Sequence, residues 1–210
     1  EAQPPQVYRA LQWLEAIFQH PPSRIEEEER ERRHILLPDG YWDPDQRQGG
    51  VGAVLLRQGQ CPLTFGGMIP PHLAYQLLYM QETDEEKKQR NTQAELLAIL
   101  MSILMWHQSL KGCSLLILTD STSAKDNCES GTSADQQSRD LVSLILLFST
   151  IFGIHLWFEW VPSKQNPGDP YSRPLTAADE AKHLDDLLKA ERWAPIWPSF
   201  LRSSPSSWRS

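Results

Sequence analysis

The chain has 210 residues, the length of one full domain with extensions, and it is long enough to bury a sizeable core. Its formal net charge of -7 excludes a basic module that coats nucleic acids and a charge-driven membrane binder. The apolar runs are too short for a membrane span, the three cysteines lack zinc-ligand spacing, and the N-terminus shows no signal-peptide pattern. We therefore expect an intracellular protein, in the cytoplasm or nucleus. Because the chain starts with Glu1 rather than Met, we expect a piece of a longer open reading frame.

Residues 1–33 predict a helix followed by a charged linker. Apolar residues recur at helical spacing over Val7–Gln19, and Pro21 and Pro22 end the pattern. The run of charges in Arg24–Arg33 is typical of a solvated spacer.

Three antiparallel strands are predicted next. His34–Leu37 is a short apolar run, and Gly50–Leu56 is separated from Cys61–Met68 by a glycine-containing gap typical of a hairpin turn. The segment Tyr41–Gln48 is rich in Asp, Gln and Pro and predicts a loop. Residues 69–90, with a short helix at Leu73–Met80 and a polar stretch after it, interrupt the pattern and are interpreted as an inserted, mobile arm.

The remaining chain alternates helices and strands. A long buried helix is expected to be capped by Asn91 or Thr92. The expected elements are the helix Thr92–Leu110, the strand Ser114–Thr119, the helix Leu141–Phe152, the strand Ile154–Val161, the helix Thr176–Trp193 and a disordered tail from Trp197 to Ser210. This order predicts a mixed α/β sheet with helices packed on it, within a domain at 34–174, followed by a C-terminal helix and tail at 175–210.

Four acidic residues stand at positions typical of a metal site. Asp39 follows the first strand, Asp120 the fourth and Asp169 the fifth, while Glu95 lies in the apolar run of the long helix. Carboxylates are hard oxygen ligands suited to Mg²⁺ or Mn²⁺, and two such ions can activate water and stabilise a leaving oxygen in phosphodiester hydrolysis. The pattern is typical of nucleases and polymerases.

Each of these carboxylates also has a structural interpretation. Asp120 and Asp169 both stand where a helix cap is expected, and Asp39 fits a turn. Glu95 fits the first turn of a helix, where the dipole favours acids, although an unpaired carboxylate on a buried helix is costly. The sequence alone leaves these alternatives open.

Four segments, in this order along the chain, resemble motifs of ribonuclease H. They are Asp39-Gly40 with Gly49–Leu55 (the first hairpin), Asn91–Ala98 (the glutamate helix), Ile117–Ser121 (the central strand end) and Phe158–Arg173. The last resembles the closing segment of ribonuclease H domains in retroelement reverse transcriptases, with the pattern N-P-x-D-x-x-S-R. The resemblance spans roughly residues 34–173.

The resemblance implies a ribonuclease H-like mixed five-stranded sheet with helices packed on both faces. It implies a metal-dependent endonuclease that hydrolyses the RNA strand of RNA–DNA hybrids as part of a reverse transcriptase, with Asp39, Glu95, Asp120 and Asp169 as catalytic residues and metal ligands. Mg²⁺ is the implied cofactor and Mn²⁺ an alternative. The implied partners are the hybrid and the polymerase part of the same polyprotein, and Val7–Gln19 resembles the connection that follows that part.

The sequence departs from the family before the last carboxylate, where cellular enzymes carry a flexible histidine. That loop here has Lys164 and Gln165 instead. The sequence shows no cluster of Lys and Trp like the basic protrusion that grips hybrids in some cellular enzymes. The nearest basic group is Lys87, Lys88 and Arg90, and a solvated loop is the favoured interpretation of these residues.

Two further alternatives concern the first ligand and the reaction. Asp43 and Asp45 are rival first carboxylates, but Asp39 is preferred because it directly follows the first apolar run. A 3′–5′ exonuclease expects D-x-E on the first strand, where this chain has Asp39-Gly40-Tyr41. A catalytically degenerate ribonuclease H-like module is the other alternative, and the presence of all four carboxylates argues against it.

Overall fold

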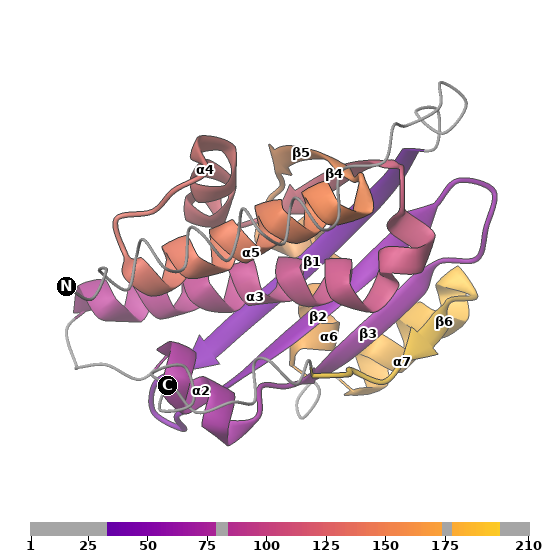
Figure 1. Ribbon diagram of the computed structural model, residues 1–210. Helices are drawn as coiled ribbons and strands as arrows, with labels where there is room; N and C mark the ends of the chain where they lie inside the picture. Colours follow the sequence, from indigo (N-terminus) through magenta and orange to yellow (C-terminus); the bar gives the residue numbers. More distant parts are fainter. Residues whose placement is uncertain (1–32, 79–83, 174–177, 198–210) are drawn as a thin grey trace.

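A computed structural model describes residues 33–78, 84–173 and 178–197. The helix expected at Val7–Gln19, most of the charged linker and the tail beyond residue 197 lie outside these residues. The centre of the molecule is one mixed sheet with the strand order β5-β4-β1-β2-β3-β6 (Figure 1). Its strands are β1 (Arg33–Asp43), β2 (Gln48–Arg57), β3 (Leu63–Met68), β4 (Ser114–Thr119), β5 (His155–Trp160) and β6 (Glu191–Trp193).

Short turns make β1, β2 and β3 an antiparallel meander. The expected turn between β2 and β3 is confirmed: Gln60 N–H donates to the Arg57 carbonyl over 3.2 Å, and Gly59 adopts a φ of 68°, which glycine tolerates without strain. β4 pairs parallel with β1, and β5 pairs parallel with β4. The sheet therefore extends from β1 on both sides, through β2 and β3 on one side and through β4 and β5 on the other.

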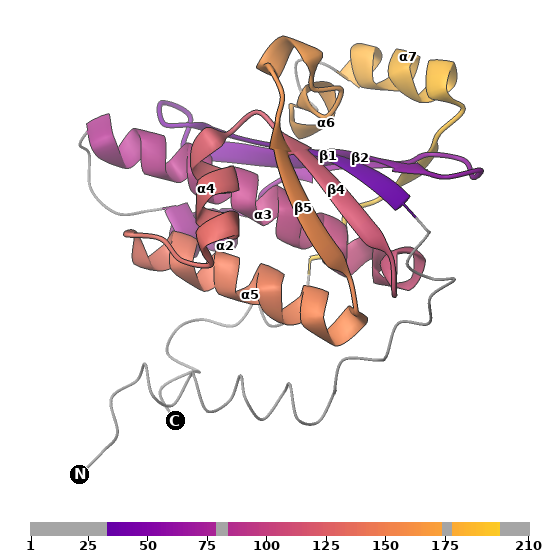
Figure 2. The ribbon, with the colours of Figure 1, turned by 90° about the horizontal axis from the view of Figure 1, so that it is seen from above.

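Helices cover both faces of the sheet, as predicted. The helices α3 (Asp84–Leu110) and α5 (Gln136–Phe152) lie on one face with α4 (Thr122–Ser130) beside them, whereas α6 (Asp169–Ser172) and α7 (Ala178–Leu188) lie on the other (Figure 2). The short helix α2 (Pro71–Leu78) follows β3. None of the helices in the described part of the chain combines the length and hydropathy that crossing a membrane requires.

Alternation along β2 divides the core between these two layers. Val51, Ala53 and Leu55 join the large apolar cluster on the α3 and α5 side. Val54 points to the opposite face, where it joins Leu37, Tyr171 and Ala181 in a smaller cluster. The period of two is what a strand buried on both faces requires.

The prediction of five strands was wrong, because β6 adds a sixth at the edge of β3. The helix expected over Thr176–Trp193 ends at Leu188, and Lys189 then takes a positive φ of 50°. Glu191 N–H donates to the Pro62 carbonyl over 2.9 Å, which places β6 parallel to β3. A three-residue strand with no apolar pattern of its own depends on that pairing.

Two predicted element boundaries were also wrong. The segment expected as a loop, Tyr41–Gln48, is a turn only over residues 44–47, because β1 pairs with β2 as far as Asp43↔Gln48. The long helix begins at Asp84 rather than at a cap at Asn91 or Thr92. Glu, Lys, Gln and Arg are strong helix formers, so a polar stretch extends α3 without an apolar stripe. The range 69–90 thus contains α2 and the first turns of α3.

Glycines in β2 and β3 let α6 lie against the sheet. A Cβ at Gly52 would meet the Tyr171 carbonyl carbon at 2.4 Å, and one at Gly66 would meet the Tyr171 carbonyl oxygen at 2.1 Å. A Cβ at Gly50 would clash with the backbone of Ser172 in the same way. Side chains at these positions would push α6, and with it Asp169 and Ser172, away from β1.

Candidate metal centre

The site lies where β1 and β4 separate. Their parallel ladder runs from Arg33↔Ser114 to Leu36↔Ile117 and then ends. Asp39 and Asp120 each come three residues after this last pair. Open α/β sheets hold ligands at the carboxyl ends of their strands, at the point where the strand order reverses.

Three of the four predicted site residues meet at this point of the sheet. Asp39, Glu95 and Asp120 each offer a carboxylate oxygen, and these oxygens all lie within 4.8 Å of one another. Glu95 reaches them because α3 passes directly against β1 at Gly40, where a Cβ would lie 2.2 Å from the Ala94 carbonyl oxygen. The Gly40 N–H also donates a hydrogen bond to the Glu95 carboxylate. Asp39 and Glu95 are only 3% and 7% exposed.

Burial and the neighbouring negative charges disfavour the charged forms of Asp39 and Glu95. Burial is the largest cause that raises the pKa of Asp39 to about 7, and the negative charges of Asp120 and Asp169 add to it. Burial also raises the pKa of Glu95 well above its ordinary value, followed by the charges of Asp39 and Asp120. A cation bound between the three carboxylates would lower the pKa values of Asp39 and Glu95 again, because its positive charge favours their ionised forms.

The unsatisfied oxygens of this carboxylate group fit a divalent cation. Glu95 Oε2 and Asp120 Oδ1 are buried and accept no hydrogen bond from any described group. Buried carboxylate oxygens without a partner are costly, and hard oxygen donors are the ligands that Mg²⁺ and Mn²⁺ prefer. The donor set therefore has the chemistry of a divalent-cation site.

Asp169 lies at the edge of this group rather than within it. It begins α6, and its carboxylate forms an ion pair of 2.9 Å with Arg173, whose guanidinium lies 5.3 Å from the centre of the Tyr41 ring. Asp169 is nevertheless close enough to raise the pKa of Asp39. The structure thus brings three predicted ligands together and places the fourth beside them.

The structural interpretations of the four carboxylates do not hold in the structure. Ser121 caps α4 by accepting from Ala124 N–H over 3.2 Å, so Asp120 is not the cap. The residue before α6 is Gly168, and no side chain caps that helix. Glu95 lies well beyond the first turn of α3, and Asp39 pairs with Gly52 inside β1 rather than in a turn.

The rival first carboxylates lie outside the group of three. Asp43 accepts hydrogen bonds from the backbone N–H groups of Asp45 (2.9 Å) and Gln46 (3.0 Å), so it stabilises the turn between β1 and β2. Asp45 is exposed. Asp43 therefore ends β1 and supports the turn that contains Asp45.

Two residues without a predicted role hold the loop before α6 against β1. Asn166 Nδ2 donates to the Pro38 carbonyl over 2.8 Å, and its Oδ1 accepts from Gly168 N–H over 2.9 Å. Ser172 donates a hydrogen bond to Asp39 Oδ2. Both belong to the N-P-x-D-x-x-S-R segment, and this pattern was the one feature of the sequence that could have pointed to them.

Lys164 and Gln165, which the sequence has in the loop where cellular ribonuclease H carries a histidine, lie exposed in the short 3₁₀ helix η2 (Ser163–Gln165).

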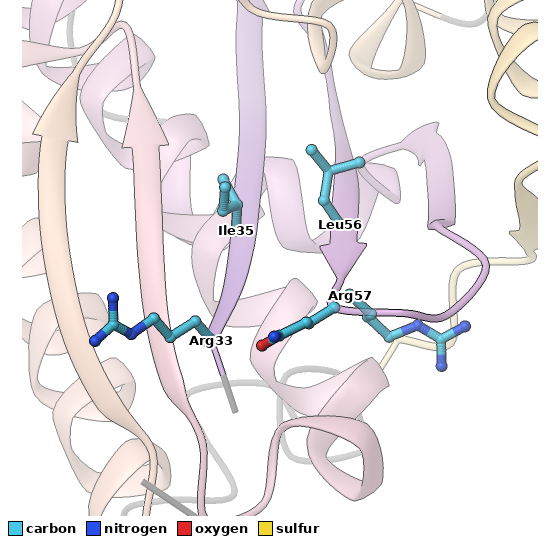
Figure 3. A pocket seen from close by; sticks show the side chains of 5 residues that line it. Arg33, Ile35, Leu56 and Arg57 are labelled. Atoms are coloured by element: carbon cyan, nitrogen blue, oxygen red, sulfur yellow. The ribbon is translucent and has the colours of Figure 1, made fainter. Parts of the chain in front are cut away.

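A separate hollow lies at the other end of β1, lined by Arg33, Ile35, Leu56, Arg57 and Gln58. Figure 3 shows Ile35 and Leu56 side by side on the sheet, with the Arg33 and Arg57 side chains pointing away from each other. None of the three carboxylates lines it, and four residues of strand, about 13 Å, separate Ile35 from Asp39.

No protein-family model and no curated protein matches this sequence. Solved structures do match. Ribonuclease H1 from the halophilic archaeon Halobacterium salinarum NRC-1 aligns with a TM-score of 0.52 at 18% identity, over 70% of this chain and 98% of that chain. The N-terminal ribonuclease H domain of a Mycobacterium tuberculosis protein aligns with a TM-score of 0.48 at 15% identity, over 73% and 99%. LC11-RNase H1, solved in complex with an RNA/DNA hybrid, aligns with a TM-score of 0.47 at 17% identity, over 71% and 99%. The Halobacterium salinarum match, together with the sheet order, shows that this chain has a ribonuclease H-like fold.

Proposed function

We propose that this chain is a metal-dependent endonuclease that hydrolyses the RNA strand of RNA–DNA hybrids. The observation that carries the proposal is the group Asp39, Glu95 and Asp120, three carboxylates within 4.8 Å at the split between β1 and β4. The ribonuclease H-like fold and the four ordered sequence motifs support it. Intracellular location follows from the same proposal, because that is where such hybrids form.

Asp39, Glu95 and Asp120 would hold the cation, with Asp169 at the edge of the site, and Mg²⁺ is the ion we propose, with Mn²⁺ as a substitute. When bound, divalent cations at such a site activate a water and stabilise the leaving oxygen of the phosphodiester. No side chain is then needed as a nucleophile.

The chain's own part is to hold these carboxylates in place before substrate arrives. The Gly40 N–H fixes the Glu95 carboxylate, and the Ser172 hydroxyl fixes that of Asp39. Asn166 keeps the loop before α6 against β1, so the edge carboxylate of Asp169 stays beside the group. Preorganised ligands lower the reorganisation that the reaction requires.

We further propose that the domain is part of a retroelement reverse transcriptase and works with the polymerase part of the same polyprotein. The segment Phe158–Arg173 supports this context, because its pattern resembles the closing segment of those domains. The net charge of -7 also favours it, since a chain that repels polyanions gains from a partner that holds the hybrid.

The direct test is cleavage of end-labelled substrates in Mg²⁺ or Mn²⁺. We expect cuts in the RNA strand of a hybrid and none in single-stranded RNA or duplex DNA. Asp120→Asn should remove most turnover, whereas Asp43→Asn, which changes a turn carboxylate, should cut at nearly the wild-type rate. Equal cleavage of duplex DNA, or undiminished activity in excess chelator, would refute the proposal.

The same assay separates the catalytically degenerate module from the enzyme. A degenerate module would bind hybrid without cutting it at any concentration of Mg²⁺ or Mn²⁺. Cleavage that proceeds from a 3′ end and spares internal positions would instead indicate an exonuclease.

A further inference from the structure

An exposed tryptophan is hydrogen-bonded to the backbone of Asp120, one of the three carboxylate residues. Trp160 is the last residue of β5 and pairs with Thr119, the residue before Asp120. Its indole Nε1–H donates a hydrogen bond to the Asp120 backbone carbonyl over 3.1 Å. The ring is therefore held next to the Asp120 backbone by two anchors, the strand backbone and the indole N–H.

Packing in the hydrophobic core does not explain why a tryptophan stands at this position. Trp160 is 50% exposed, and within the described residues only Trp157 and Ile196 are comparably exposed large apolar groups. The polar end of the indole is satisfied by Asp120, so the surface left in solvent is aromatic ring. A rigid aromatic surface loses little conformational entropy on binding, which is why tryptophan is enriched at binding hot spots.

The charge of the site favours an uncharged contact with the substrate. Three carboxylates lie within 4.8 Å of one another and the chain carries a net charge of -7, so phosphate contacts near the site are opposed electrostatically. An A-form-like duplex exposes its sugars in a wide, shallow minor groove, where a flat ring can pack. That packing needs no charge and no base sequence.

We infer that Trp160 is a substrate-contacting residue whose indole packs on the sugar of the nucleotide next to the scissile phosphate. The inference rests on the proposed function, since it takes the RNA–DNA hybrid as the substrate. It assigns to β5 the rim of the binding surface closest to Asp120. It also explains why a tryptophan is left half exposed at this position.

The test is direct binding of a labelled hybrid to the intact chain in chelator, followed by fluorescence anisotropy. Trp160→Ala should weaken binding about 10-fold or more, the usual loss when a contacting tryptophan is truncated. Trp160→Phe keeps an aromatic ring but loses the bond to Asp120, and it should bind nearly as well as wild type. Trp157→Ala is the matched control, because residues three apart on a strand face opposite sides of the sheet.

A second readout does not depend on whether Trp160→Ala folds. Bound hybrid should protect tryptophan fluorescence from acrylamide quenching in the wild type and in Trp157→Phe, and this protection should be lost in Trp160→Phe. Protection that persists in Trp160→Phe would overturn the inference. So would equal loss of binding in Trp160→Phe and Trp160→Ala, which would mean that Trp160 acts only through the Asp120 carbonyl.

Adding Mg²⁺ to the same samples separates this inference from the proposed function. Wild type that cuts hybrid while Trp160→Ala binds it equally well would overturn the role of Trp160 alone. Wild type that neither binds nor cuts hybrid would overturn both.

Discussion

Ser172 in α6 donates a hydrogen bond to the Asp39 carboxylate in β1, across 133 residues of sequence. Both residues are buried, and this bond is one of the causes that lower the pKa of Asp39 against the larger effect of burial. It joins the last motif of the chain to the first. Ser172 therefore favours the ionised form of Asp39, which is the form that binds a cation.

Removing this hydroxyl should weaken metal binding. In Ser172→Ala, Asp39 loses its donor and its orientation, and we expect Mn²⁺ affinity to fall about 10- to 100-fold, as for other residues that orient metal ligands. Isothermal titration calorimetry measures the change. Ser149→Ala is the control, because Ser149 is also buried but donates to the Leu146 carbonyl in α5. Equal affinities in the two variants would mean that Ser172 does not support the site.

Without metal, the free energy of unfolding should decrease as the pH rises from about 4 to about 7. The folded state holds a proton on Asp39 up to its raised pKa of about 7, whereas the unfolded chain releases it near the ordinary value of 3.8. One extra proton in the folded state corresponds to a slope of about -1.4 kcal/mol per pH unit within that window. The raised pKa of Glu95 acts in the same direction.

Urea unfolding in chelator at several pH values checks this expectation. Asp39→Asn should flatten the dependence of the free energy of unfolding on pH, and so should saturating Mg²⁺. In either case the folded state no longer holds the extra proton on residue 39. A wild-type slope that is no steeper than that of Asp39→Asn would show that Asp39 is ionised throughout the window.

The C-terminal helix α7 should contribute to the stability of the whole domain. Asp185 accepts hydrogen bonds from Thr64 (2.7 Å) and Tyr171 (2.8 Å), so it ties α7 to β3 and α6. Asp185→Ala would remove the acceptor that both buried hydroxyls share, and we expect a loss of about 2–4 kcal/mol in the free energy of unfolding. Asp186→Ala, at the exposed neighbour, is the control and should lose less than about 0.5 kcal/mol in urea unfolding.

The sequence predicted which carboxylates lie together better than it predicted the edges of the fold. The group Asp39, Glu95 and Asp120 was predictable because the segments that carry these residues resemble ribonuclease H motifs in order, although each carboxylate alone also fitted a cap, a turn or a helix dipole. β6 was not predictable, since Glu191–Trp193 becomes a strand only through its pairing with β3. The start of α3 was missed because helix propensity, without an apolar stripe, gives no periodic signal.

Contacts between distant segments explain the rest of what was missed. Asn166 and Ser172 stood inside a recognised pattern, but their partners, Pro38 and Asp39, lie in β1. The glycines of β2 were part of the first motif. A side chain at Gly50 or Gly52 would clash with the backbone of α6, which lies far along the chain, so the need for glycine there could not be predicted. Such relationships require the folded topology.

The most direct test of the account is thermal unfolding of wild type and Asp120→Asn, each in chelator and in Mg²⁺. Asp120→Asn should melt at a higher temperature than wild type in chelator, because it removes a negative charge that raises the pKa values of Asp39 and Glu95. Mg²⁺ should stabilise wild type by about 2.7 kcal/mol at 100 times its Kd, and Asp120→Asn by much less. If Asp120→Asn instead melts lower in chelator and gains as much from Mg²⁺ as wild type does, the three carboxylates do not form a shared metal site.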